Sequence, residues 1–81
     1  MKELHLSIVS PEKVMFDGDV KIVTLPGTIG SFSILAGHAP IVSSLKEGTL
    51  VYTTLDNQEH TLDIHGGFVE MSDGEVSVCI S

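Results

Sequence analysis

Apolar and polar residues alternate with a period of two at both ends of the chain. Residues 4–8 read LHLSI and residues 75–80 read EVSVCI, so every second side chain is apolar in each segment. Successive side chains of a β-strand point to opposite faces, and this alternation is the mark of a strand with one buried face. We therefore expect a half-buried strand at each end.

The chain between these ends divides into further short strands. No window of eleven or more residues keeps an apolar i, i+3, i+4 pattern, and the many Val, Ile and Thr residues favour extended backbone. Asp17-Gly18 predicts a tight hairpin between strands at 13–16 and 20–25, and the same dipeptide at Asp73-Gly74 marks another turn. Gly, Pro, Asn or Asp bound the other expected strands, which are residues 31–35, 41–45, 49–55 and 60–64. About eight short strands and almost no helix are expected.

Short strands at this spacing are typical of all-β sandwiches and barrels. Two antiparallel sheets packed face to face would let the inward-facing residues share one core. The positions of Leu25, Val51 and Leu55 stay open. The expected core consists of Leu4, Leu6, Ile8, Val14, Phe16, Val20, Ile22, Phe32, Ile34, Leu50, Tyr52, Leu62, Ile64, Val76, Val78 and Ile80.

Composition supports one packed domain over residues 1–81. The chain is 42% hydrophobic and 19% charged, with a mean hydropathy of +0.31, which argues against disorder. Eleven acidic residues face four Lys and no Arg, for a formal charge of −7. Such a surface has no basic stripe for phosphates, so nucleic acid is not an expected partner.

Cysteine usage and the terminal sequence favour a reducing, cytosolic setting. Cys79 is the single cysteine and has no partner for an internal disulfide, and residues 1–13 lack the features of a signal peptide. No apolar run approaches the ~20 residues that span a bilayer. We expect any association with a membrane to occur through other proteins.

Two loops are candidates for binding. Residues 25–30, LPGTIG, predict a protruding contact turn; a phosphate cradle is the weaker reading, because the Lys-Ser/Thr of a P-loop is missing. His38 lies in AGHAP, where Gly and Pro place the imidazole on a loop. It is read first as a surface histidine and second as a contact to a partner.

The residues with catalytic or metal-binding chemistry do not converge in the expected strands. Alternation places His60 on the face opposite to Asp63 and His65, and two ligands make at best a weak metal site. The carboxylates are scattered, and Gly66-Gly67 reads as a bulge or a sharp strand transition. We predict no catalytic residue, no metal and no cofactor.

The order of several short motifs resembles the epsilon subunit of F-type ATP synthase. These motifs are SPE at 10–12, GDV at 18–20, LPG at 25–27 with Gly30, GHAP at 37–40, LKEG at 45–48 and GGFVE at 66–70. The resemblance runs from about Leu4 to Ile80, and its specificity lies in the joint order and spacing.

The resemblance implies a flattened antiparallel β-sandwich of about 8–10 short strands. It implies a non-catalytic rotor subunit in the central stalk of a proton-translocating F-type ATP synthase, at the cytoplasmic face of a bacterial plasma membrane. The implied partners are the gamma subunit and the ring of c subunits. The matching positions for gamma contact are Ser10, His38, Ala39, Pro40, Val42 and Ser43, and those for c-ring contact are Gly30, Ser31 and Phe32.

The sequence departs from the family at two places. Ser31 occupies a position that can be acidic in relatives, so a charge-based contact there is in doubt. Relatives usually continue into a two-helix domain that senses ATP or inhibits hydrolysis, whereas this sequence stops at Ser81, and we expect it to lack those helices.

Two other classes of function stay open. A free-standing β-sandwich module that binds carbohydrate is disfavoured because such sites use aromatic platforms, and the chain has no Trp and one Tyr. A small hydrolase or metal enzyme would need His38, His60, Asp63 and His65 to converge.

Overall fold

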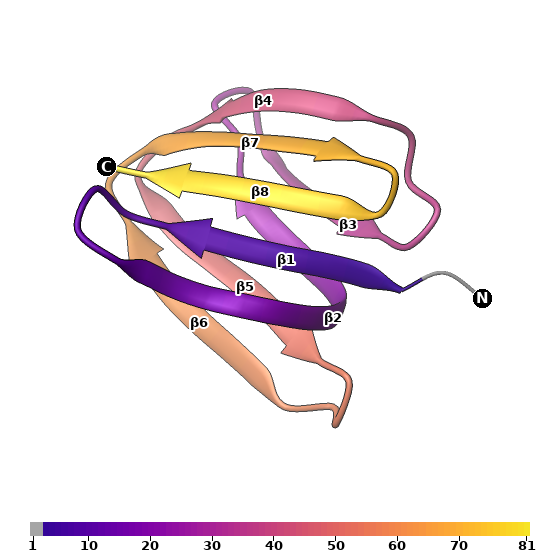
Figure 1. Ribbon diagram of the computed structural model, residues 1–81. Coiled ribbons are helices and arrows are strands. Elements are labelled where there is room, and N and C mark those ends of the chain that lie inside the picture. Colours follow the sequence, from indigo (N-terminus) through magenta and orange to yellow (C-terminus); the bar gives the residue numbers. More distant parts are fainter. Residues whose placement is uncertain (1–2) are drawn as a thin grey trace.

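The computed structural model describes residues 3–81, which form eight β-strands and no helix (Figure 1). The all-β class predicted from the sequence is therefore confirmed. The strands are β1 (Leu4–Val9), β2 (Val14–Pro26), β3 (Ser31–Leu35), β4 (Ile41–Leu45), β5 (Gly48–Thr54), β6 (Glu59–Ile64), β7 (Gly67–Ser72) and β8 (Glu75–Ile80).

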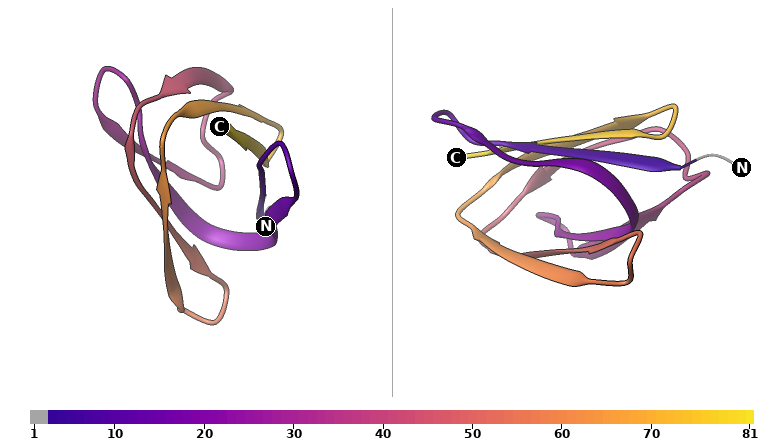
Figure 2. Two further views of the ribbon diagram at one scale, coloured as in Figure 1. Left: turned by 90° about the vertical axis from the view of Figure 1, so that its left-hand side faces the viewer. Right: turned by 60° about the horizontal axis from the view of Figure 1, so that its bottom comes forward.

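One continuous sheet curls over itself to make the two layers of the sandwich. The strand order is β4-β7-β8-β1-β2-β5-β6, and β3 pairs with β2. The long strand β2 pairs with β1 through its first half and with β3 and β5 through its second half, so it passes from one layer to the other (Figure 2). A bridge between Gly27 and Leu45 joins the end of β2 to β4 on the far side.

The sheet is mixed rather than purely antiparallel. The first and last strands, β1 and β8, pair in parallel, with His5 opposite Glu75 and Val9 opposite Cys79. Their other neighbours, β2 and β7, pair antiparallel. The two ends of the domain are thus joined in the middle of one layer, where both strands have partners on each side.

The predicted hairpin at Asp17-Gly18 is wrong, because this dipeptide lies inside β2. Gly18 pairs with Leu6, and Phe16 lies so close that a Cβ on Gly18 would be 3.1 Å from its ring. The glycine leaves room for this ring. The turn between β1 and β2 falls earlier, where Ser10 donates its backbone N–H to the carbonyl of Lys13 at 2.9 Å.

A β-bulge at Lys21 explains a second difference from the expected pattern. Val20 pairs with Thr54 and Ile22 with the next residue, Thr53, so Lys21 is an extra residue in β2. The extra residue reverses the alternation. Val20 and Val23 are both buried in consequence, and Ile22, which the sequence placed in the core, is only partly buried.

The predicted turn at Asp73-Gly74 is confirmed, and it joins a strand that the prediction lacked. Both residues have positive φ, 52° and 77°, as a two-residue hairpin with right-handed twist requires. The strand β7 precedes this turn, and the sharp transition read from Gly66-Gly67 lies between β6 and β7.

The core lies between the two layers and includes most of the expected residues. Val14 is a further correction, because it begins β2 beside the open turn and is 60% exposed. Leu25 is buried, Val51 is partly buried and Leu55 is exposed. The buried apolar residues are Leu4, Leu6, Ile8, Val20, Val23, Leu25, Ile34, Leu45, Leu50, Ile64, Val69, Met71, Val76, Val78 and Ile80, with Phe16, Phe32, Ile41, Tyr52 and Leu62 packed against them.

Candidate partner-binding surfaces

The loops gather at two opposite ends of the sandwich. At one end, here called the corner end, lie residues 10–13, 27–30, 46–47 and 65–66. At the other, the turn end, lie the β3–β4 loop (residues 36–40) and the β7–β8 turn (residues 73–74) (Figure 1). The pairing of β4, β7 and β8 fixes this separation, since Leu45 lies opposite Gly67 and Ile41 opposite Met71.

The three residues predicted to contact a c ring lie at the corner end, at the start of β3. Gly30 and Ser31 are exposed. Phe32 is half-buried, and its ring covers Gly27 so closely that a Cβ there would lie 2.8 Å from the ring. Phe32 therefore shapes the β2–β3 loop, and the residues before it form the accessible surface.

Ile29 is an exposed feature of this loop that the sequence reasoning did not select. Its relative exposure is 102%, so the side chain is fully in solvent. The preceding residue, Thr28, is held by Ser44, with the Thr28 N–H donating to the Ser44 carbonyl at 3.1 Å and the two hydroxyls 3.0 Å apart. The signal in the sequence was a large apolar residue inside the turn LPGTIG.

The residues predicted to contact gamma fall in two places. His38, Ala39 and Pro40 are exposed on the β3–β4 loop at the turn end, and Val42, on β4, is 74% exposed. Ser43 alternates to the other side of β4 and is half-buried. Residues 38–43 thus form one continuous segment of surface.

Ser10 lies apart from this segment, at the corner end. Its hydroxyl oxygen accepts the N–H groups of Glu12 and Lys13 at 3.3 and 3.2 Å, and donates to the Lys13 carbonyl at 3.2 Å. Ser10 therefore closes the β1–β2 turn, as serine hydroxyls commonly do. The side chain of Ser10 thus forms the turn whether or not a partner protein is bound.

The ring of His38 has one nitrogen bound within its own loop. Nδ1 lies 2.6 Å from the carbonyl oxygen of Ala39, and the backbone N–H of His38 donates to the Leu35 carbonyl at 3.1 Å. A carbonyl only accepts, so Nδ1 carries the hydrogen. In the neutral ring Nε2 is then an acceptor.

His5, Asp17 and Asp19 form a cluster on the outer face of β1 and β2. The ring atom Nε2 of His5 lies 2.6 Å from Asp17, and Nδ1 lies 3.0 Å from Asp19. The hydrogen bonds to Asp19 and Asp17 raise the pKa of His5, and the bond to His5 lowers the pKa of Asp19. The sequence reasoning missed this cluster because it placed a turn at Asp17-Gly18.

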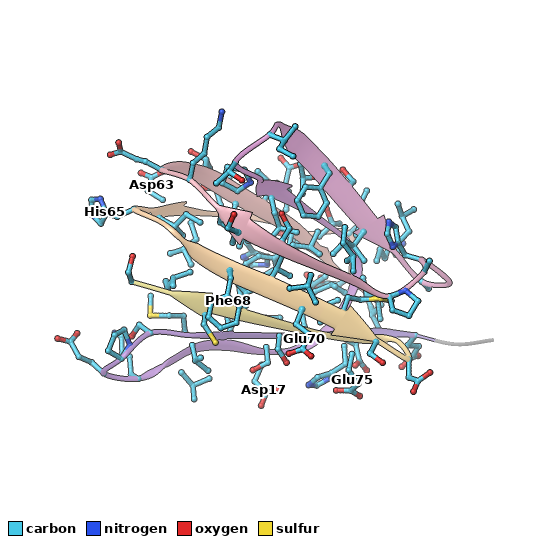
Figure 3. All side chains as sticks on the ribbon, turned by 90° about the horizontal axis from the view of Figure 1, so that it is seen from above. Asp17, Asp63, His65, Phe68, Glu70 and Glu75 are labelled. Atoms are coloured by element: carbon cyan, nitrogen blue, oxygen red, sulfur yellow. The ribbon has the colours of Figure 1, made fainter. Side chains whose placement is uncertain are left out.

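The same outer face is acidic. Asp17, Glu70 and Glu75 gather on it, from three different strands (Figure 3). The strand registers place Glu70 opposite Ser77 and Glu75 opposite His5. A cationic partner is therefore favoured over an anionic one at this side of the domain.

His60, Asp63 and His65 do not meet. His60 stacks on Tyr52 with ring centroids 5.1 Å apart, and Asp63 accepts a hydrogen bond from Thr49 at 2.9 Å. His65 lies beyond β6, 3.8 Å from Glu47 (Figure 3). Among residues 3–81 no three His, Cys, Asp or Glu side chains are placed to hold a metal ion.

These features define a small β-sandwich domain with exposed loops at two ends. Its accessible features are the loops at these two ends and exposed apolar side chains such as Ile29 and Val42. No helix of the described residues is long and apolar enough to cross a membrane.

The chain belongs to the ATP synthase delta/epsilon chain family. The family described as "ATP synthase, Delta/Epsilon chain, beta-sandwich domain" matches residues 3–81. The resemblance stated from the short motifs is thereby confirmed.

Curated relatives agree with this assignment. An ATP synthase epsilon chain of Rhodopseudomonas palustris (strain TIE-1) is 42% identical over 96% of this chain and 57% of its own length. Epsilon chains of Bordetella parapertussis and Campylobacter fetus are 38% and 39% identical, over 96% and 99% of this chain. The chain spans only 56% and 62% of these two relatives.

Solved structures share the fold. A chain of the Euglena gracilis mitochondrial ATP synthase, in a structure of OSCP, F1 and c-ring, superposes with a TM-score of 0.91 at 24% identity, over 96% of this chain and 50% of that chain. A chain of the Tetrahymena thermophila mitochondrial ATP synthase, in a structure of its central stalk and c-ring, gives 0.81 at 16% identity, over 98% and 63%.

Proposed function

We propose that this chain is a non-catalytic rotor subunit of a proton-translocating F-type ATP synthase, which binds the gamma subunit and the c ring. The observation that carries the proposal is the family match over residues 3–81. The domain works by binding and transmits force between the two partners.

The proposed gamma surface is centred on residues 38–43 at the turn end. It presents His38, Ala39 and Pro40 from the loop and Val42 from β4, and Ser43 is half-buried on the other side of β4. Ser10 lies at the corner end, apart from residues 38–43, so it would contact gamma only if gamma extends along the domain.

The proposed c-ring surface is the β2–β3 loop at the corner end. Gly30 and Ser31 are exposed there, and the half-buried Phe32 packs its ring against Gly27. We add Ile29 to this surface because a fully exposed apolar side chain on a held loop loses little conformational freedom when it binds.

Rigidity of the sandwich suits the transmission of force between these two surfaces. Each strand is paired, and β2 runs through both layers, so a force applied at one end passes along continuous hydrogen-bonded backbone. The subunit is proposed to lie peripherally, at the cytoplasmic face of a bacterial plasma membrane, held there by its partners.

Co-purification with the cognate gamma subunit and c ring tests both surfaces. Deletion of residues 30–32 would remove the ring that packs on Gly27, so the substitutions Ile29→Asp and Ser31→Lys are sharper than the deletion. We expect them to weaken c-ring contact and leave gamma binding intact, whereas His38→Ala weakens gamma binding. The proposal fails if the unmodified chain binds neither partner.

A further inference from the structure

We propose that a pocket at the turn end binds a lysine or arginine side chain of the partner that docks there; this rests on the proposed function, with the gamma subunit as that partner. The pocket has a volume of about 180 Å³ and lies between the β3–β4 loop and the β7–β8 turn. Its lining residues are Gly37, His38, Pro40, Met71, Asp73 and Gly74.

The pocket is formed before any partner arrives. Asp73 and Gly74 are fixed in a two-residue turn with φ of 52° and 77°, and the Gly74 carbonyl accepts the N–H of His5 at 2.8 Å. On the other side, the His38 N–H is bound to Leu35, and Met71 belongs to the core. Preorganised walls reduce the entropy lost on binding.

The polar side chains that line the pocket are hydrogen-bond acceptors, so they favour a ligand that donates hydrogen bonds. His38 uses its Nδ1 hydrogen on Ala39, which leaves Nε2 of the neutral ring as an acceptor. The Asp73 carboxylate only accepts, and no side chain within residues 3–81 forms a salt bridge or hydrogen bond with it. An anionic or acceptor-only ligand would therefore be repelled or left unpaired.

The apolar walls and the size favour a long side chain with a cationic tip. The exposed Pro40 offers the surface along which the methylene stem of Lys or Arg packs, and the buried Met71 also lines the pocket. The volume greatly exceeds the ~10–15 Å³ that one water needs, so the pocket has room for a side chain. The formal charge of −7 adds a long-range attraction for a cationic partner.

The test measures the affinity of the whole chain for its cognate gamma subunit, at about 50 and 300 mM salt. Asp73→Asn removes the charge but keeps the turn, because Asn tolerates the left-handed conformation as Asp does. Asp63→Asn is the matched control, since it removes one exposed carboxylate from β6, away from the pocket. A thermal unfolding midpoint equal to that of the unmodified chain verifies the fold of each variant.

We expect Asp73→Asn to raise the dissociation constant about tenfold at low salt and to flatten its salt dependence. Asp63→Asn should stay within about twofold of the unmodified chain. Equal affinity and salt dependence for Asp73→Asn and the unmodified chain would overturn the pocket assignment while leaving the proposed function in place. Failure of the unmodified chain to bind gamma would overturn both.

Discussion

Replacement of Gly67 by alanine tests how closely β7 and β8 pack at the corner end. Gly67 begins β7 with φ of 145°, and it pairs with Ile80. A Cβ at this position would lie 2.1 Å from the carbonyl oxygen of Cys79 and 3.0 Å from Cα of Ile80. Both neighbours are backbone atoms, which cannot move by a change of rotamer.

The expected loss is large for a domain of this size. The positive φ costs an L-residue about 1–3 kcal/mol. To relieve the contact, β7 and β8 must move about 1 Å farther apart at this point. This movement weakens one or two hydrogen bonds worth about 1 kcal/mol each. The sum is about 2–5 kcal/mol, against a total stability of about 4–12 kcal/mol for 81 residues.

Thermal and urea unfolding, followed by far-UV circular dichroism, measures this loss. We expect the midpoint of Gly67→Ala to fall by about 10 °C or more. Gly30→Ala is the control, because no atom lies within 4 Å of a Cβ built there. A loss below about 1 kcal/mol for Gly67→Ala would show that the strands separate easily and that the rigidity inferred for the sandwich is wrong.

Three other predictions concern the core, the charged cluster and the loop. Leu6→Ala, at a fully buried site, should cost about 2–5 kcal/mol in urea unfolding, whereas Val42→Ala, at an exposed site, should stay within about 0.5 kcal/mol. Because the pKa of His5 is raised in the folded protein, protonated His5 stabilises the fold fully below the ordinary pKa of 6.5, and this stabilisation is lost as pH rises through the folded pKa. The pKa of Asp19 is lowered, so its contribution to stability is present above the ordinary pKa of 3.8. The urea midpoint of the unmodified chain should therefore fall between about pH 5.5 and 8.5, and less so in His5→Gln; an equal fall in both would refute the role of the cluster. Ile29→Asp should leave the thermal midpoint unchanged within about 2 °C, because its side chain touches solvent only.

Prediction of the fold succeeded where local pattern and burial agree. Residues 4–8 and 75–80 alternate regularly, and β1 and β8 follow that alternation. The Asp73-Gly74 turn was recognisable because its conformation depends on the two residues themselves. The all-β class followed from the same local information.

The errors arose where distant contacts override local preference. Asp17-Gly18 has the composition of a turn, but pairing with β1 and the ring of Phe16 hold it in a strand. The bulge at Lys21 appears in no sequence pattern, because the pairing with β5 decides which residue is extra. It moved Val23 into the core in place of Ile22.

The candidate sites divide in the same way. The sequence by itself indicated a loop within residues 25–30, another at residues 36–40 and the family of the chain, because turn chemistry and motif order depend on neighbouring residues alone. The structure places the first of these loops at residues 27–30, after β2 ends at Pro26. Only the tertiary structure decided that these loops lie at opposite ends, that Ile29 is fully exposed, and that Asp73 joins His38 around one pocket. Strand pairing between segments far apart in the chain sets those positions, and such pairing depends on the burial of the whole core.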